Sequence, residues 1–488
     1  MHDTFRKEQS MFQYRLPSDP TAEQVGDHIQ RMKEAQLDAG APTLDVRKDR
    51  LNRAIDLLRN HRDELIDAIR ADYGNRSRQQ TLFADIFAPI EALRHSRDHL
   101  DEWMRKPTVI EPLPGTMAWV EHQPLGVVGV ISPWNFPIVL AFGPLADVFA
   151  AGNRAMLKPS ELTPQTSELL AELISRYFEP TELTTVLGGT STGAMFSSQP
   201  FDHLVFTGST QVAHHVMRAA SDNLVPVTLE LGGKSPVLVD HDANLRTVAE
   251  RVLTIKTFNA GQICLSPDYV LIQADRIEAF VEHAKGVVAQ MYPTMRDNPD
   301  YTAMLNSRGF ERQMALVADA KEKGARIVSL APNGEDLTDP VIHKMAPTLV
   351  VGTTPTMRLT QEEIFGPVLP MVTYETFDQA VAYINARERP LAIYYFGGDT
   401  KHREKIAGET TSGALVVNDA MTHAFFASLP FGGVGASGMG HYHGEYGFRA
   451  FSHAKPVLLQ SDTGESNLPM RAPYRLDGEA QIEAMIEG

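Results

Sequence analysis

The pattern of apolar and polar positions divides the chain into a helical first part and a longer part in which strands alternate with helices. Between residues 21 and 105, apolar residues recur three and four positions apart, with charged residues on the opposite face, which is typical of amphipathic helices. From about Trp119 onward, short apolar runs predict strands at 126–132, 155–158, 203–206, 236–239, 269–272, 326–330, 348–352, 392–396 and 414–417. Helix-length amphipathic segments lie between most of them, such as 164–178, 211–221 and 375–386. The alternation predicts two α/β lobes with parallel sheets.

One long apolar stretch resembles a membrane span, because no formally charged residue occurs from Pro124 to Ala146. Pro133, Pro137 and Pro144 interrupt it, and such breakers favour a strand, a turn and a buried helix instead. The tail from 460 to 488 is polar, with a short helix expected at 478–486. We therefore expect no membrane anchor.

Composition narrows the classes of partner. The chain has 488 residues, and its 45 Lys and Arg residues against 61 acidic ones leave a net charge of −16. Such a surface repels phosphate backbones and anionic lipids, so neither nucleic acid nor a membrane is an expected partner. Cys264 is the single cysteine, which excludes an intrachain disulfide and a multi-cysteine metal site. A charged N-terminus without an apolar core argues against a secretory signal. Together with the single cysteine, this leads us to expect a reducing cytoplasm as the compartment, and no bound metal.

Three local patterns imitate known ligand sites. Residues 433–438 match GxGxxG, but no strand-to-helix junction surrounds them, so a structural loop is the better interpretation. Residues 231–235 resemble half of a phosphate-binding Walker loop, yet the first glycine of that motif would fall on Thr228. His441 and His443 lack the further ligands of a metal site and favour a surface or capping role.

Two residues carry candidate chemistry of a different kind. A lone cysteine is most often an inert small hydrophobe, but Cys264 follows the small residues Ala260 and Gly261, which leave room for a substrate. Glu230 lies between two leucines at the end of an apolar run. It is either a surface acid at a strand end or a carboxyl whose apolar setting raises its pKa into the range of a general base.

Three further segments suggest binding roles. Asn135 lies between Trp134 and Phe136, where its amide needs a hydrogen bond and could donate to an oxyanion. In 158–161 a lysine and an acid follow a strand and could meet ribose hydroxyls. In 206–210 a strand meets a helix start, where backbone N–H groups suit a pyrophosphate.

Taken in order, these segments make the chain resemble the NAD(P)-dependent aldehyde dehydrogenase superfamily. The resemblance rests on PWNFP (133–137), LKPSE (157–161), FTGST (206–210), LELGGKSP (229–236), GQIC (261–264), EEIFGPV (362–368) and PFGG (430–433). It extends from about residue 20 to 460. The segments 266–270 and 435–444 look most like the class 3 branch, which includes fatty, aromatic and coniferyl aldehyde dehydrogenases.

The resemblance implies an α/β fold with a variant Rossmann cofactor domain, an α/β catalytic domain and a small β oligomerisation arm. By analogy, residues 1–106 and 126–232 would form the NAD(P)-binding domain and residues 233–444 the catalytic domain. Residues 107–125 and 445–465 would form the arm, and residues 466–488 a C-terminal tail. The family assembly further implies a homodimer.

The resemblance also assigns roles. Cys264 would be the nucleophile, Glu230 the general base and Asn135 the oxyanion donor, in an oxidation that passes through a thiohemiacetal and a thioester. NAD, with NADP as a second option, would be held by Trp134, Lys158, Ser160, Glu161, Thr207, Gly208, Ser209, Leu231, Glu363 and Phe365.

Two alternatives and the choice of substrate stay open at this point. A CoA-acylating dehydrogenase generally lacks the base that Glu230 supplies, and a silent binding paralogue would not keep Cys264, Glu230 and Asn135 together. Phe425 and Phe426 suggest an apolar or aromatic tunnel wall, although core packing explains them equally well. The expected substrate is an aromatic, coniferyl-type aldehyde or a medium- to long-chain aliphatic one.

Overall fold

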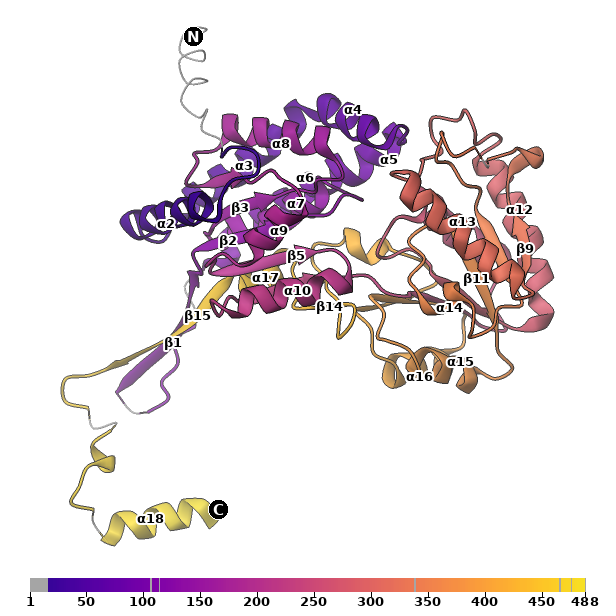
Figure 1. Cartoon of the computed structure of the whole chain (residues 1–488). Helices are drawn as coiled ribbons and strands as arrows, with labels where there is room; N and C mark the ends of the chain where they lie inside the picture. Colours follow the sequence, from indigo (N-terminus) through magenta and orange to yellow (C-terminus); the bar gives the residue numbers. More distant parts are fainter. Residues whose placement is uncertain are drawn as a thin grey trace.

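The chain folds into two α/β lobes and a two-stranded ribbon that projects from the first lobe (Figure 1). The computed structural model describes residues 16–105, 108–113, 115–337, 339–464, 467–474 and 476–487. The α/β class with largely parallel sheets, predicted from the alternation of strands and helices, is confirmed.

A six-stranded sheet forms the centre of the first lobe. In spatial order its strands are β14 (Gly438–Met439), β6 (Val227–Glu230), β5 (His203–Thr207), β2 (Val127–Ile131), β3 (Arg154–Lys158) and β4 (Leu183–Thr185). All neighbours pair in parallel except β14, which is antiparallel to β6. The chain winds to one side of β2 through β3 and β4, and to the other side through β5 and β6. In open α/β sheets, ligands bind beyond the carboxyl ends of the strands at such a switch point.

Helices cover both faces of this sheet because its side chains alternate between two separate cores. Val128 and Val130 join a cluster with α3, α4, α6, α7 and α8, whereas Val127 joins a second cluster with α2, α9 and α10. The helices of this lobe are α2 (Ala22–Ala39), α3 (Leu44–Asn60), α4 (Arg62–Tyr73), α5 (Arg78–Thr81), the π-helix η1 (Leu82–Phe87), α6 (Ala88–Trp103), α7 (Val139–Ala150), α8 (Pro164–Tyr177), α9 (Thr190–Ser197), α10 (Thr210–Ser221) and α17 (Gly444–Ala450).

A seven-stranded sheet forms the second lobe. Its spatial order is β13 (Ala414–Val417), β12 (Ala392–Phe396), β7 (Pro236–Val239), β8 (Tyr269–Ile272), β11 (Val368–Thr373), β10 (Thr348–Val351) and β9 (Arg326–Ser329), with β9 alone antiparallel. Its helices are α11 (Leu245–Thr257), η2 (Phe258–Gly261), η3 (Ala274–Arg276), α12 (Ile277–Met291), α13 (Ser307–Glu322), η4 (Pro332–Gly334), α14 (Arg358–Gln361), α15 (Phe377–Asn385), α16 (Thr400–Glu409) and η5 (Thr422–Phe425).

The strands predicted from the sequence are present, with ends that differ by at most one residue. The strand β11 was not predicted, because Pro370 interrupts its apolar run and proline normally argues against a central strand. The domain boundaries stay a prediction. The short strand β14 lies before the expected boundary at 444, yet it pairs with β6 of the first sheet.

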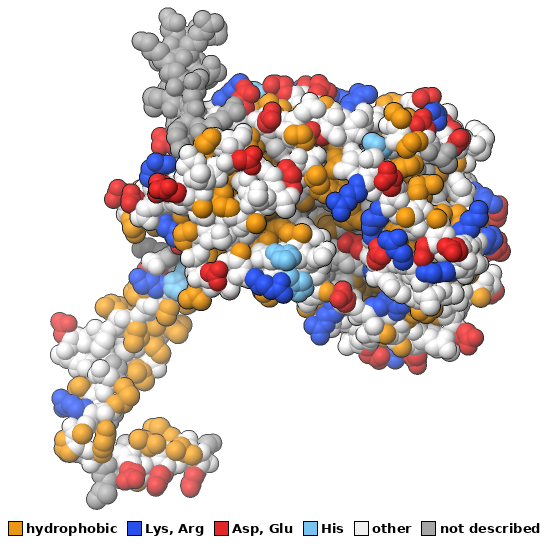
Figure 2. Space-filling model, in the orientation of Figure 1, with side chains coloured by type: hydrophobic (Ala, Val, Ile, Leu, Met, Phe, Trp, Pro, Cys, Tyr) orange, Lys and Arg blue, Asp and Glu red, His pale blue; other side chains and the backbone are white. Residues whose placement is uncertain are grey.

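The ribbon consists of β1 (Thr116–Pro124) and β15 (Ser452–Gln460), which pair antiparallel over their whole length. It stands away from the lobes and leads to η6 (Leu468–Met470) and α18 (Leu476–Glu487), the helix expected in the tail (Figure 1). Apolar side chains lie along the ribbon and on α18 (Figure 2); those exposed include Met117, Val120, Leu458 and Leu459. Among the described helices, none combines the length and apolar character needed to cross a membrane.

Candidate active site

Cys264 lies just after a tight left-handed turn between α11 and β8. Asn259 and Ala260 have φ values of 50° and 52°, and Gly261 has 72°. Residues with a Cβ atom rarely adopt this conformation, so the turn stores backbone strain. At position 261 a Cβ atom would lie 2.4 Å from the carbonyl oxygen of Gly366, so this residue must be glycine. The turn brings Cys264 to the wall of a cavity.

The surroundings of Cys264 keep its sulfur protonated at neutral pH. Burial, assisted by the negative charges of Glu363 and Glu230, raises the pKa of Cys264 to about 12. Because the thiolate is the nucleophilic form of cysteine, the thiol needs a base to take its proton before it can attack.

Glu230, which the sequence predicts to be the general base, lies near enough to this thiol to influence its pKa. It is the last residue of β6 and is 2% exposed. Among the described residues, no donor contacts either of its carboxylate oxygens, and burial raises the pKa of Glu230 well above the ordinary value. A buried carboxyl without a partner holds a proton more readily than an exposed one, and a general base must accept a proton.

Asn135 lies in the loop between β2 and α7, and its amide faces the cysteine loop. Its Nδ2 donates to the carbonyl oxygen of Gln262 at 3.2 Å. An amide nitrogen carries two N–H groups, so this bond orients the side chain and leaves the second N–H for a further acceptor. An oxyanion formed on a Cys264 adduct is a suitable one.

Glu363 comes close to the chain after β6. Its Oε1 accepts a hydrogen bond from the backbone N–H of Gly233 at 3.1 Å, and a Cβ atom on Gly232 would lie 2.2 Å from the same oxygen. The glycine pair therefore makes room for this carboxylate. Burial raises the pKa of Glu363 to about 7. Two residues on, Phe365 has a φ of 50° and its ring meets that of Trp134 edge-on at 5.5 Å.

The remaining residues predicted to bind the cofactor follow the carboxyl ends of β3, β5 and β6, at one edge of the first sheet. At β3, Lys158 Nζ donates to Glu161 Oε2 at 3.1 Å, which pairs the amine with the acid. Beside them the hydroxyl of Ser160 accepts from the N–H of Leu162 at 3.2 Å. An amine and an acid held together suit the hydroxyl groups of a ribose.

At the ends of β5 and β6, the chain turns closely around the start of α10. The Ser209 hydroxyl caps this helix by accepting from the N–H of Val212 at 3.4 Å, and the Gly208 N–H donates to the carbonyl oxygen of Glu230 at 3.0 Å. The buried hydroxyl of Thr207 has no partner among the described residues. Leu231 is buried and donates its N–H to Ser437. The remaining backbone N–H groups at this helix start, with an unpaired hydroxyl beside them, suit a pyrophosphate.

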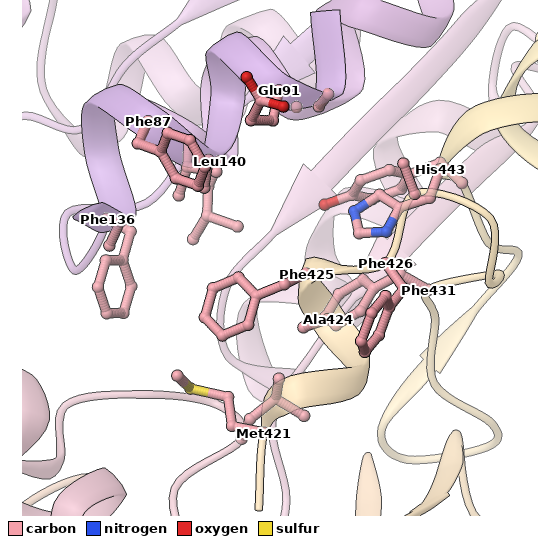
Figure 3. A pocket seen from close by; sticks show the side chains of 18 of the residues that line it. Phe87, Glu91, Phe136, Leu140, Met421, Ala424, Phe425, Phe426, Phe431 and His443 are labelled. Atoms are coloured by element: carbon pink, nitrogen blue, oxygen red, sulfur yellow. The ribbon is translucent and has the colours of Figure 1, made fainter. Parts of the chain in front are cut away.

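A cavity of about 550 Å³ opens beside Cys264 and is mostly apolar. This volume is typical of small-molecule sites. The aromatic rings in its wall belong to Phe83, Phe87, Phe136, Phe258, Phe425, Phe426, Phe431 and Tyr442, and the ionisable groups to Glu91, His95, Asp147 and His443. Figure 3 shows η1 and α6 on one side of this space and the segment from Met421 to Phe431 on the other.

The cavity extends the predictions made from the sequence. Phe425 and Phe426 line it, as expected of a tunnel wall. His441 is exposed, and His443 is the N-cap residue of α17, which agrees with a surface or capping role, although the His443 side chain makes no capping hydrogen bond. The His443 ring also lines the cavity, which was not predicted. Phe83 and Phe87 escaped the sequence reasoning because they read there as ordinary helix positions. The glycine pattern at 433–438 forms a loop next to β6, as expected.

The comparisons agree with this geometry. The model of the aldehyde dehydrogenase family matches residues 14–457. The coniferyl aldehyde dehydrogenase of Pseudomonas sp. strain HR199 is 60% identical over 453 residues, which cover 93% of this chain and 94% of that protein. The substrate-bound AldH of Staphylococcus aureus superimposes with a TM-score of 0.88 at 33% identity, covering 95% of this chain and 99% of the other. Betaine aldehyde dehydrogenase from the same organism, in complex with NAD+, has a TM-score of 0.82 at 26% identity, with 92% and 90% coverage.

Proposed function

Because this chain belongs to the aldehyde dehydrogenase family, we propose that Cys264, Glu230 and Asn135 are the groups with which it oxidises an aldehyde to a carboxylate. The oxidation uses NAD, as in the relative solved with NAD+. The observation that carries the assignment of roles is the position of Cys264, a free thiol at the wall of an apolar cavity, close enough to Glu230 for the two groups to interact electrostatically.

The first half of the reaction forms a thioester on Cys264. An aldehyde has no leaving group other than hydride, and hydride departs only from a tetrahedral alkoxide. Cys264 first loses its thiol proton to water. The thiolate then forms this alkoxide by adding to the carbonyl carbon, and the second N–H of Asn135 donates to the oxygen that becomes negative. When bound, NAD supplies the acceptor for the hydride.

The second half releases the acid. Glu230 accepts a proton from a water molecule, whose oxygen adds to the thioester carbon. The sulfur of Cys264 then leaves and takes up the proton that Glu230 received, which regenerates both groups. The unpaired carboxylate oxygens of Glu230 support this role, because no competing donor among the described residues occupies them. The presence of this base also favours hydrolysis over transfer of the acyl group to CoA.

The residues at the edge of the first sheet fit a dinucleotide. Lys158 and Glu161 offer a donor and an acceptor to ribose hydroxyls, and the start of α10 offers backbone N–H groups to the pyrophosphate. An acid at the ribose disfavours a 2′-phosphate by charge repulsion, so we propose that NAD is preferred over NADP. Glu363 and Phe365, beside Trp134, would hold the nicotinamide end.

The cavity supports a bulky apolar substrate. Its aromatic wall can stack on a flat ring or surround an alkyl chain. The identity of 60% to a coniferyl aldehyde dehydrogenase favours the aromatic choice. We therefore propose an aromatic aldehyde of the cinnamaldehyde type as the substrate, with medium-chain aliphatic aldehydes next.

The projecting ribbon supports assembly into a homodimer. A two-stranded ribbon has two edges with unpaired backbone groups, and exposed apolar side chains such as Leu458 add to its tendency to pair. The tail helix α18 exposes Ile482, Met485 and Ile486, by 61%, 80% and 78%. A partner subunit would cover these surfaces. A catalytic free thiol further supports a reducing compartment such as the cytoplasm.

The decisive experiment replaces the nucleophile. Cys264→Ala should keep the fold and the binding of NAD but lose at least about a thousandfold in activity, and one equivalent of iodoacetamide should inactivate the wild-type enzyme. Activity of the purified variant above that level would refute the role of Cys264. A panel of aldehydes compared by kcat/KM tests the substrate, and better turnover of acetaldehyde than of any aromatic or C6–C12 aldehyde would refute that part.

A further inference from the structure

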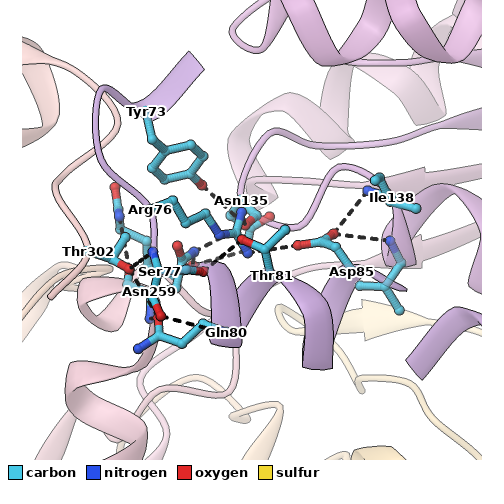
Figure 4. A network of polar contacts seen from close by, with 12 residues as sticks. Tyr73, Arg76, Ser77, Gln80, Thr81, Asp85, Asn135, Ile138, Asn259 and Thr302 are labelled. Atoms are coloured by element: carbon cyan, nitrogen blue, oxygen red, sulfur yellow. Dashed lines mark hydrogen bonds and ion pairs between the residues drawn. The ribbon is translucent and has the colours of Figure 1, made fainter. Parts of the chain in front are cut away.

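Arg76 and Asp85 form an ion pair that is completely enclosed by protein. Arg76 Nη2 lies 2.8 Å from Asp85 Oδ2, and both side chains are 0% exposed. Arg76 follows α4, and Asp85 lies on the π-helix η1. Removing two charges from water is costly, so an enclosed pair is a poor source of stability and calls for a specific reason. The contacts at its two ends supply one (Figure 4).

The arginine end of the pair holds the backbone of Asn135. Three donors converge on its carbonyl oxygen: Arg76 Nη1 at 2.9 Å, Asn259 Nδ2 at 3.1 Å and the Tyr73 hydroxyl at 3.2 Å. The guanidinium carbon also lies 5.0 Å and 4.9 Å from the ring centres of Tyr73 and Phe136. The carbonyl of Asn135 is thus held from several directions by groups that are themselves buried.

The aspartate end holds the other side of the same loop. Asp85 Oδ1 accepts hydrogen bonds from the backbone N–H groups of Ile138 at 3.1 Å and Val139 at 3.3 Å, at the start of α7. An acid is favourable at this position because helix N-termini carry unpaired N–H groups and a partial positive charge. The pair therefore spans residues 135–139 and fixes both ends of the segment that presents the Asn135 amide.

The same network reaches the cysteine loop. Asn259 Nδ2, which contacts the Asn135 carbonyl, also donates to the carbonyl oxygen of Gln262 at 3.1 Å. That oxygen is the acceptor of the Asn135 side chain. The backbone and the amide of Asn135 are thus both tied to the loop that carries Cys264.

We propose that the Arg76–Asp85 ion pair is a positioning device that holds the Asn135 amide in place over the Cys264 adduct. The proposal rests on the role of Asn135 in the proposed function. Neither charged residue touches the reacting atoms; both act through the loop 135–139. Because a displacement of about 1 Å in a reacting group costs on the order of a hundredfold in rate, an enclosed pair at this place has a kinetic use.

The test measures steady-state kinetics and thermal melting of Asp85→Asn and Arg76→Lys. We expect kcat to fall by about tenfold to a hundredfold with little change in KM. Glu182→Gln is the matched control, since it weakens two partly buried ion pairs of the same lobe, with Arg50 at 3.1 Å and with Arg53 at 2.7 Å. This control should melt at a lower temperature and keep kcat within about twofold of wild type, a change too small to reflect a repositioned catalytic group.

A double-mutant cycle separates positioning from general loosening of the fold. In an Asn135→Ala background, Asp85→Asn should cause no further loss of kcat, because the group being positioned is gone. If the loss of kcat in the double variant equals the product of the losses in the two single variants, the proposal is overturned. Full kcat in Asp85→Asn alongside an inactive Asn135→Ala would also overturn it, whereas full activity of Asn135→Ala would refute the oxyanion role itself.

A second variant covers the case in which Asp85→Asn does not fold. Arg76→Met combined with Asp85→Leu removes both charges and leaves no unpaired one, an exchange that buried ion pairs often tolerate. The folded double variant should show the same loss of kcat. A folded double variant with wild-type kcat would overturn the proposal.

Discussion

The protonated state of Cys264 at rest predicts that iodoacetamide reacts slowly with the enzyme in the absence of NAD. The alkylating agent reacts with the thiolate, so its rate reports the fraction of Cys264 that is ionised. Burial and the two nearby carboxyls, Glu363 and Glu230, oppose this ionisation. The experiment therefore measures the rate of alkylation by iodoacetamide at a series of pH values.

The magnitude follows from the rise in pKa from 9.0 to about 12. At pH 8 this rise lowers the thiolate fraction from about one tenth to about 10⁻⁴, a thousandfold effect. A more basic thiolate is also a better nucleophile, by about 0.4–0.5 logarithmic units per pKa unit, which returns a factor of about 15–30. The native enzyme should therefore react about 30- to 60-fold more slowly than an ordinary thiol.

The same thiol in the urea-unfolded chain is the reference, and because Cys264 is the single cysteine, mass spectrometry counts one adduct in both states. The logarithm of the native rate should rise with unit slope from about pH 8 to 10, above the pKa of about 7 of Glu363. Glu363→Gln should accelerate the alkylation. The control is Glu362→Gln, which should leave the rate unchanged, because the neighbouring Glu362 carboxylate pairs with Arg358 at 2.9 Å. A plateau below about pH 9, near the ordinary cysteine pKa, or a native rate equal to the unfolded one would refute the reasoning.

Four further predictions concern other parts of the molecule. Glu230→Gln should release a burst of about one NADH per site and then turn over about 10²–10⁴ times more slowly, and full steady-state turnover would exclude the deacylation role. Wild-type kcat/KM should be higher with NAD than with NADP, and Glu161→Gln should narrow the difference; the reverse preference would contradict the ribose contact. Burial raises the pKa of Asp147 from 3.8 to about 7. The free energy of unfolding should therefore fall, by up to about 4 kcal/mol, as the pH rises through this interval. Asp147→Asn should melt at a higher temperature than wild type at pH 8, and its melting temperature should depend less on pH. Truncation after Gln460 should change kcat/KM for bulky aldehydes more than for acetaldehyde, and sedimentation that shows only monomer would contradict the dimer.

Much of the fold could be predicted because central strands of a doubly covered sheet are apolar on both faces. The run 126–132 is an example, since Val127 and Val128 enter separate cores. The chemistry was also visible in the sequence, because a cysteine among small residues and an acid between leucines are unusual in composition. Residue types alone, however, could not say whether Glu230 is exposed. The structure shows it buried, with neither carboxylate oxygen paired among the described residues.

The parts that escaped prediction depend on contacts between distant segments. Arg76 and Asp85 stand in a stretch rich in charged and polar residues, where each reads as a solvent-facing helix position. Their burial follows from the docking of η1 against the loop 135–139, which no periodicity within either segment records. Likewise, β11 runs through Pro370, which local preference alone argues against.

The π-helix η1 explains how one turn serves both the cavity and the loop. Its wider winding changes the direction in which successive side chains point, and such turns often occur at functional sites. Within η1, Asp85 is completely buried against the loop 135–139, while Phe83 and Phe87 line the cavity. An aldehyde that contacts these rings therefore contacts the same turn that holds Asn135 in place. If the turn transmits that contact, bulky aldehydes should depend more strongly on Asp85 than acetaldehyde does, and the loss of kcat in Asp85→Asn should grow with the size of the substrate.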